Sequence, residues 1–270
     1  MKTIFTFRSR RRHGLLRVVA LALLTSSCAT TQPPQVAPVA HAPAPVVSAS
    51  PVQSGAAQPE LATVLAALAP QADPAVLRYA VQAQQCAVAS GAVTEPQRLA
   101  VIDYSRPSTV PRLWVFDLRQ RKLLYSEHVA HGKHSGANLA NAFSNVEGSF
   151  QSSLGLFSAA ETYVGGNGYS LRMDGLEPGI NDRARERLLV IHGADYVNPV
   201  QAQRQGRLGR SYGCPALRRA VADGVINSLK DGQLVFAYYP DSKWLASSRF
   251  LNCATTASAT GRSATAPTRG

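Results

Sequence analysis

The chain has 270 residues and a mass of 28.8 kDa, a size typical of one or two domains. Apolar residues make up 45% of it and charged residues 16%, which suffices for a hydrophobic core and excludes a chain that is disordered throughout. The formal net charge is +12, but six basic residues lie in the first 28 positions, where no acidic residue occurs, and the rest carries only +6. That charge suits an anionic surface such as a cell wall. Without a basic stripe interleaved with aromatic residues, it does not indicate a nucleic-acid-binding protein.

The first 28 residues are predicted to be a secretory signal peptide, which implies export to the bacterial cell envelope or periplasm. Basic residues up to Arg17 precede a short apolar run, and small residues follow it. Residues 15–24 are too few to span a bilayer, which takes about 20 helical residues. Cys28 after small residues predicts a lipoprotein that is lipidated there and so anchored to a membrane. The alternatives are ordinary cleavage near Ala29 and an amphipathic surface helix.

Residues 29–60 contain seven prolines and no Lys, Arg or Asp, which predicts an extended Pro/Ala-rich linker without a packed core. Residues 254–270 are rich in Ala, Ser and Thr and are predicted to form a disordered tail. The folded part is therefore expected between these two segments.

In that part, helices come first and strands follow. A short helix is predicted over residues 61–69, and a second begins at Pro74, is capped by Asp73 and ends at Gly91. Strands are expected at residues 99–104, 113–118, 122–130, 188–191 and 234–239, with long connections at 132–148 and 164–168. Apolar residues spaced by four from Leu217 to Leu229 predict a helix directly after Cys214. The predicted fold class is a mixed, β-dominated domain with a few flanking helices.

The segment from Ser211 to Pro215 has the composition of a nucleophile loop. Proline is favoured as the first residue of a helix, so Cys214 is expected at a helix N-cap, where the helix dipole lowers the pKa of a thiol. Gly213 permits a tight turn that directs backbone N–H groups at an oxyanion. His192, at the end of an apolar strand, is the candidate base of a Cys–His acyl-transfer site. The alternative is a buried structural cysteine.

These residues resemble the signature of the YkuD-type L,D-transpeptidase catalytic domain, a His followed after a spacer by Ser/Thr-x-Gly-Cys. His192-Gly193 and Ser211-Tyr212-Gly213-Cys214 carry the similarity, with further similar segments at residues 129–132, 152–157 and 181–187. The resemblance covers about residues 95–245. It implies a β-sandwich-like catalytic domain at 95–253, preceded by a helical lead-in at 61–94.

The resemblance implies acyl transfer on peptidoglycan stem peptides, with no metal or organic cofactor. Cys214 would attack the carbonyl of the L-centre that precedes a terminal D-amino acid, and an amine would resolve the thioester. His192 would take and return the proton, oriented by the Gly193 carbonyl, and the hydroxyl of Tyr169 or Tyr212 would assist the oxyanion. The sequence gives no signal of oligomerisation.

Two features depart from the family pattern. Ser211 follows His192 by 19 positions, which implies a larger loop over the site. Pro215-Ala216-Leu217 stand where an Arg or Asn often follows the family's Cys, so another residue must recognise the substrate carboxylate. The candidates are Arg172, Arg183, Arg185 and Arg210, each of which could instead be a surface or ion-pair residue.

Four cysteines in an exported chain suggest a disulfide. If Cys28 is lipidated and Cys214 stays a thiol, Cys86 and Cys253 remain as a pair. The alternative is two separate buried thiols.

Three other functions stay open. A carboxypeptidase would use water in place of the amine. A zinc-dependent wall hydrolase would use His131 and His134 with His192 and Cys214 as ligands, whereas His128 reads as a structural histidine. A wall-binding module would keep the fold without turnover.

Overall fold

The computed structural model describes residues 57–253, with only the backbone described for residues 57–59. The predicted signal peptide, Cys28, the linker up to residue 56 and the predicted tail lie outside these residues. Among the described helices, none combines the length and the apolar character needed to cross a membrane.

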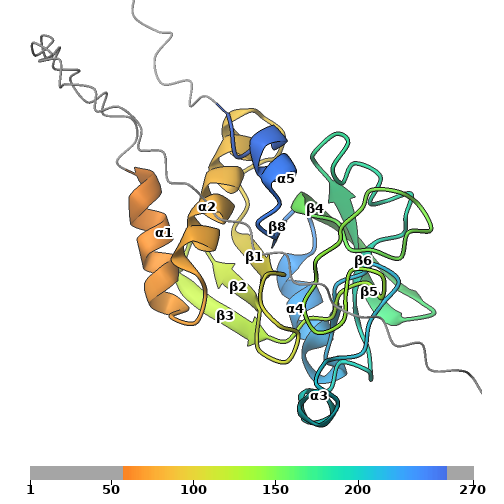
Figure 1. Cartoon of the computed structure of the whole chain (residues 1–270). Coiled ribbons are helices and arrows are strands. Elements are labelled where there is room, and N and C mark those ends of the chain that lie inside the picture. Colours follow the sequence, from red (N-terminus) through yellow and green to blue (C-terminus); the bar gives the residue numbers. More distant parts are fainter. Residues whose placement is uncertain (1–56, 254–270) are drawn as a thin grey trace, which may run out of the picture. The chain divides into compact units, whose positions relative to one another are not determined.

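Helices precede, interrupt and follow a set of strands (Figure 1). In chain order the elements are α1 (Ala57–Leu68), α2 (Pro74–Ala89), β1 (Arg98–Asp103), β2 (Leu113–Asp117), β3 (Lys122–Glu127), β4 (Gly155–Gly165), β5 (Gly168–Gly175), β6 (Val190–Gly193), α3 (Pro199–Gln205), β7 (Ala216–Leu217), α4 (Arg219–Leu229), β8 (Leu234–Tyr238) and α5 (Ser242–Ser247).

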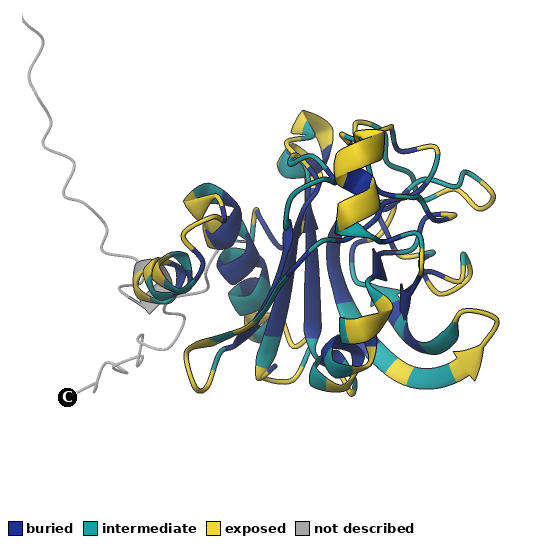
Figure 2. Ribbon diagram, turned by 90° about the horizontal axis from the view of Figure 1, so that it is seen from below, coloured by how far each residue is buried: buried dark blue, intermediate teal, exposed yellow. Residues whose placement is uncertain are grey.

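The strands form one 8-stranded sheet in the order β3-β2-β1-β8-β4-β5-β6-β7. Two pairs, β1 with β8 and β6 with β7, are parallel, and the other pairs are antiparallel. Every residue of β2 and β8 is buried, which explains why these strands are continuous apolar runs rather than alternating ones (Figure 2). The mixed, β-dominated fold with flanking helices is confirmed.

The two leading helices form largely as the sequence predicts. The Asp73 side chain accepts a hydrogen bond from the Ala75 N–H at 2.7 Å, which caps α2, and the buried face of α2 packs on β1 and β8. Helix α1 begins at Ala57, four residues before its predicted start and inside the predicted linker. Pro59 is compatible with this start because the first four N–H groups of a helix have no intrahelical partner.

The segment at residues 164–168 is not a long connection but the turn of the β4–β5 hairpin, which the sequence analysis missed. These two strands pair antiparallel from Phe157 opposite Gly175 to Gly165 opposite Gly168, and the end of the hairpin is exposed (Figure 2). β4 contains small and polar residues with few β-branched ones, so its local β-propensity is weak. Hydrogen bonding to β8 on one side and to β5 on the other stabilises β4 as a strand despite its weak local propensity.

Helix α5 attaches the end of the described chain to the sheet. Its Trp244 is buried and donates its indole N–H to the Glu177 carboxylate at 3.2 Å. The other carboxylate oxygen of Glu177 accepts the Leu156 N–H of β4 at 2.8 Å. One buried carboxylate therefore joins α5 to the beginning of β4.

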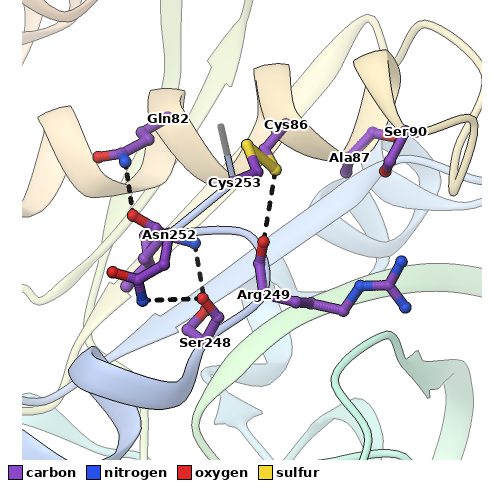
Figure 3. The surroundings of a disulfide bond; sticks show 9 residues. Gln82, Cys86, Ala87, Ser90, Ser248, Arg249, Asn252 and Cys253 are labelled. Atoms are coloured by element: carbon purple, nitrogen blue, oxygen red, sulfur yellow. Dashed lines mark hydrogen bonds between the residues drawn. A yellow bond between two sulfur atoms is a disulfide. The ribbon is translucent and has the colours of Figure 1, made fainter. Parts of the chain in front are cut away.

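A disulfide joins Cys86 in α2 to Cys253, beyond α5, with their Cα atoms 6.2 Å apart (Figure 3). Beside it, Gln82 donates to the Leu251 carbonyl oxygen at 2.6 Å, so a hydrogen bond and a covalent bond hold the same two segments together. This is the pairing that the sequence analysis expected.

Replacing both Cys86 and Cys253 by Ala should lower the free energy of unfolding by up to about 4–5 kcal/mol, because the bond closes a very long loop in the unfolded chain. Urea unfolding with and without reductant measures this effect. Reductant should destabilise the wild type and leave the double variant unchanged. Detection of both residues as free thiols in the unfolded, unreduced wild type would contradict the bond.

Candidate active site

Cys214 lies in the turn that leads into β7, and its side chain is partly buried. The thiol donates to the backbone oxygen of Leu188, with Sγ and O 3.7 Å apart. Leu188 has a φ of 54° and is 65% exposed, an unusual conformation for a large apolar residue. Strained backbone of this kind persists where the surrounding structure enforces it, and it clusters at functional sites.

The prediction that a helix begins directly after Cys214 is wrong. Helix α4 begins only at Arg219, because Ala216 and Leu217 are buried as β7 in the sheet. Cys214 therefore does not lie at a helix N-cap, and no helix dipole lowers the pKa of its thiol. Burial instead raises the pKa of Cys214, opposed by a backbone hydrogen bond at Val190 and by the positive charge of Arg187.

The pairing of β6 with β7 brings the segment that carries Cys214 beside the strand that carries His192. His192 is in register with Ala216 in this parallel pair, and Cys214 precedes Ala216 by two residues. The Cys214 thiol contacts the backbone at Leu188 and Val190, and Val190 precedes His192 by two residues in β6. The predicted nucleophile therefore lies against β6, the strand that carries the predicted base.

The hydrogen bond of His192 defines which ring nitrogen is free. Nδ1 lies 3.2 Å from the Gly193 carbonyl oxygen, which can only accept, so the proton is on Nδ1 and Nε2 carries a lone pair. Burial lowers the pKa of His192, with the charge of Arg219 acting in the same direction. The imidazole is therefore neutral at pH 7 and able to accept a proton.

Ser211 and Gly213 shape the nucleophile loop. The Ser211 hydroxyl accepts the Gly213 N–H at 3.0 Å and donates to the Cys214 carbonyl at 2.6 Å. Gly213 has a φ of 128°, and a Cβ there would lie 2.9 Å from the Gln151 oxygen. The Gly213 N–H is therefore engaged inside the loop and does not face the solvent as an oxyanion donor would.

The structure separates the predicted substrate-binding residues. Tyr169 donates to Asn227 of α4 at 2.9 Å, and it is adjacent to Ser170, which is in register with His192. Its side chain is consequently on the opposite face of the sheet from His192. Tyr212 directly precedes Gly213 and is 67% exposed beside the nucleophile loop.

The predicted arginines are already engaged. Arg172 is paired with Glu161, while Arg185 bridges Glu161 and Asp174. Arg183 is paired with Glu186 and Glu147. Arg210 donates to the backbone oxygens of Lys133 and Gly136 at 3.1 and 2.7 Å.

Two residues at the site were not predicted. Arg187 interacts electrostatically with Cys214 and donates to the oxygens of Ser144, Ser149, Gln151 and Ser153, which anchors residues 144–153 beside the site.

Tyr196 contacts the His192 ring edge-on, with ring centroids 6.5 Å apart. Burial and proximity to Cys214 raise the pKa of its hydroxyl. Only weak signals in the sequence pointed to Arg187 and Tyr196, because one is an arginine among several in 181–187 and the other a tyrosine in the predicted loop.

The histidines that were considered as zinc ligands have other partners. His131 is buried, with Nδ1 2.7 Å from Arg112 and Nε2 3.4 Å from the Gly136 oxygen, while the exposed His134 contacts the Ser149 oxygen at 2.9 Å. Burial and the Arg112 charge lower the pKa of His131 to about 3. His128 is bound to the Thr109 oxygen at 3.2 Å. Across residues 57–253, no three His, Cys, Asp or Glu side chains are grouped to hold a metal ion.

Comparison with known proteins identifies a family. Residues 68–238 match the family model YkuD_2, described as an L,D-transpeptidase catalytic domain, and this match covers more than half of the chain. The chain belongs to this family. Members are L,D-transpeptidases associated with the cell envelope and peptidoglycan. No curated protein matches this chain.

Solved L,D-transpeptidases share low sequence identity with this member of the family. One from Mycobacterium smegmatis is 15% identical over 53% of this chain and 59% of its own, with a TM-score of 0.33. One from Stackebrandtia nassauensis is 13% identical over 70% of this chain and 93% of its own, also with a TM-score of 0.33. This chain therefore spans 59% of the length of the Mycobacterium smegmatis protein.

Alkylation of Cys214 in this L,D-transpeptidase domain should be slow at neutral pH and should accelerate as pH rises beyond the ordinary thiol range, because burial raises the pKa of the thiol. Iodoacetamide labelling followed on the peptide containing Cys214 measures this rate. A plateau reached below pH 8 would show that the thiol is already ionised and would contradict the assignment.

Because of His131, the free energy of unfolding should decrease as pH falls below about 6.5, the ordinary histidine pKa. In this range His131 binds a proton in the unfolded chain, whereas in the folded chain it stays neutral down to about pH 3. The His131→Asn variant should lose less stability between pH 6.5 and 5 than the wild type does. Urea unfolding across that range measures the slopes, and His134→Asn, at an exposed histidine, is the control. Equal slopes in wild type and His131→Asn would refute the assignment.

Proposed function

We propose that this domain is a peptidoglycan L,D-transpeptidase whose nucleophile is Cys214 and whose base is His192. The observation that carries the proposal is the contact of the Cys214 thiol with the β6 backbone at Val190, two residues before His192, whose Nε2 is unprotonated. The membership of the chain in the L,D-transpeptidase family supports the reaction class.

In the first half-reaction, Cys214 Sγ attacks the carbonyl carbon of the L-centre before the terminal D-residue, while its proton passes to His192 Nε2. The tetrahedral intermediate then collapses, the bond to the D-residue breaks, and His192 returns the proton to the leaving amine. Since burial disfavours both the thiolate and the imidazolium, the resting pair is neutral, and proton transfer accompanies the attack.

Backbone groups complete the site. Ser211 holds the nucleophile loop through its two hydrogen bonds and is thus a positioning residue. Because the Gly213 N–H is bound to Ser211, we assign the Cys214 N–H as the backbone donor for the oxyanion. Gly193 provides the carbonyl that orients the imidazole.

In the second half-reaction, an amine of another stem attacks the thioester and His192 takes its proton. His192 passes this proton to the Cys214 sulfur as the thioester bond breaks, which restores the neutral pair and crosslinks or remodels the wall. With water as the acceptor the same site would act as an L,D-carboxypeptidase. A non-catalytic or zinc-dependent peptidoglycan-binding protein is the remaining alternative, and the partners of His131 and His134 do not favour zinc.

The proposal extends to the parts of the chain outside residues 57–253. We assign residues 1–28 as an export signal with Cys28 as a lipidation site, residues 29–60 as a linker that extends into α1, and residues 254–270 as a tail. Residues 61–94 are the helical lead-in to a catalytic domain at 95–253. The Cys86–Cys253 disulfide is consistent with export, because such bonds persist in oxidising compartments.

Incubation with a peptidoglycan tetrapeptide fragment should yield a Cys214 thioester that lacks one D-residue, followed by a crosslinked dimer. Intact mass spectrometry of the wild type beside Cys214→Ala measures both products, and Cys214→Ala should form neither. His192→Gln should slow acylation by at least about 100-fold, the usual contribution of a general base. Loss of the D-residue without a dimer would indicate the carboxypeptidase, and binding without any product would indicate the wall-binding module.

A further inference from the structure

Lys133, Phe150 and Tyr212 form a cluster beside the nucleophile loop, which we call the lysine clamp. The Lys133 ammonium lies 4.3 Å from the centre of the Phe150 ring and 4.4 Å from the centre of the Tyr212 ring. The two rings also contact each other, with centroids 4.9 Å apart. Cation–π contacts on both sides restrict where the ammonium can lie without occupying its N–H groups.

The backbone fixes the clamp directly against the nucleophile loop. The backbone N–H of Lys133 donates a hydrogen bond to the backbone oxygen of Ser211 at 2.8 Å. The chain also passes so close at Gly132 that a Cβ there would lie 3.0 Å from the Gly213 Cα and would clash with the Phe150 backbone oxygen. Phe150 itself has a φ of 55°, a conformation that is strained for a bulky residue. The close approach of Gly132 to Gly213 and the strained backbone of Phe150 therefore place the Lys133 ammonium next to the residues that precede Cys214.

Lys133 is the cation at this site that remains available to a ligand. Arg187 and Arg210 donate to loop oxygens, and the positive charge of Arg172 is paired with Glu161. Across residues 57–253, by contrast, no carboxylate pairs with the Lys133 ammonium and no acceptor is hydrogen bonded to it. Its three N–H groups can all donate to an anion.

The donor stem supplies an anion at a fixed distance from the reacting carbon. Its terminal D-residue ends in a carboxylate, whose carbon is separated from the scissile carbonyl carbon only by one nitrogen and one Cα. We propose that Lys133, held by Phe150 and Tyr212, binds this terminal carboxylate and makes the enzyme specific for stems that end in a free acid. The inference rests on the proposed function, since it presupposes that the donor stem binds at Cys214.

Binding to the full chain tests the proposal without turnover. In the Cys214→Ala background, calorimetry would compare a tetrapeptide stem that ends in a free D-residue with the same stem as its C-terminal amide. We expect the acid to bind about 10- to 100-fold more tightly than the amide, the range for one charge-assisted hydrogen bond. Adding Lys133→Met, which keeps the length of the side chain, should abolish that preference, whereas Lys133→Arg should retain most of it.

The control removes a positive charge at the other edge of the sheet. Lys122 lies on β3, at the opposite edge of the sheet from β6 and β7. The Lys122→Met variant should therefore keep the preference for the free-acid stem over its amide. A wild-type background that binds acid and amide equally would overturn the proposal. So would a Lys133→Met variant that loses equal affinity for both ligands, because Lys133 would then have only a structural role.

Thioester formation by the wild type and by Lys133→Met, measured in parallel with the free-acid stem and with its amide, distinguishes failure of the proposed reaction from failure of the carboxylate site. If the stem binds with the Lys133-dependent preference but wild type forms no thioester, the proposed reaction fails while the carboxylate site stands. If the thioester forms at equal rates in wild type and Lys133→Met with both ligands, the reaction stands and the carboxylate site fails.

Discussion

The short parallel pairing of β6 with β7 is the constraint on which the site depends. It comprises only two residue pairs, yet it joins β6, which carries His192, to β7, which begins two residues after Cys214. A shift of the register by one residue would turn the β7 side chains to the opposite face of the sheet and displace the loop that carries Cys214. The bonds of Ser211 within the nucleophile loop and the anchoring of residues 144–153 by Arg187 act on geometry that this pairing has already fixed.

The sequence predicted elements well where the local pattern and the tertiary contacts agree. The capped helix α2 and the buried strands β1, β2 and β8 have strong local signals, and each forms close to its expected bounds. Prediction failed where pairing with a strand distant in the sequence determines the secondary structure. The residues after Cys214 have helical spacing but pair with β6, and β4 has weak propensity but lies between two partners.

For the candidate site, the sequence indicated the residues that we propose to carry the chemistry and missed those whose position depends on distant partners. A nucleophile loop has a recognisable composition, so His192, Ser211, Gly213 and Cys214 could be proposed from the sequence and resemblance. Whether an arginine is available to a ligand depends on which carboxylate faces it. Glu161 lies on another strand than Arg172, and no local pattern reveals that pairing. The Lys133 ammonium likewise depends on two rings from separate segments.

The burial of Cys214 also bears on how long the sulfur survives between reactions. The thiolate, not the thiol, attacks peroxides and disulfides, so a cysteine with a raised pKa is oxidised slowly and exchanges slowly with disulfides. The same chain holds Cys86 and Cys253 in a disulfide, which indicates oxidising surroundings. A buried thiol with a raised pKa spends little time as the thiolate that such surroundings consume. In the proposed reaction the thiol ionises as it attacks, so its burial slows reaction with small oxidants and preserves Cys214 as a thiol where other cysteines become bonded.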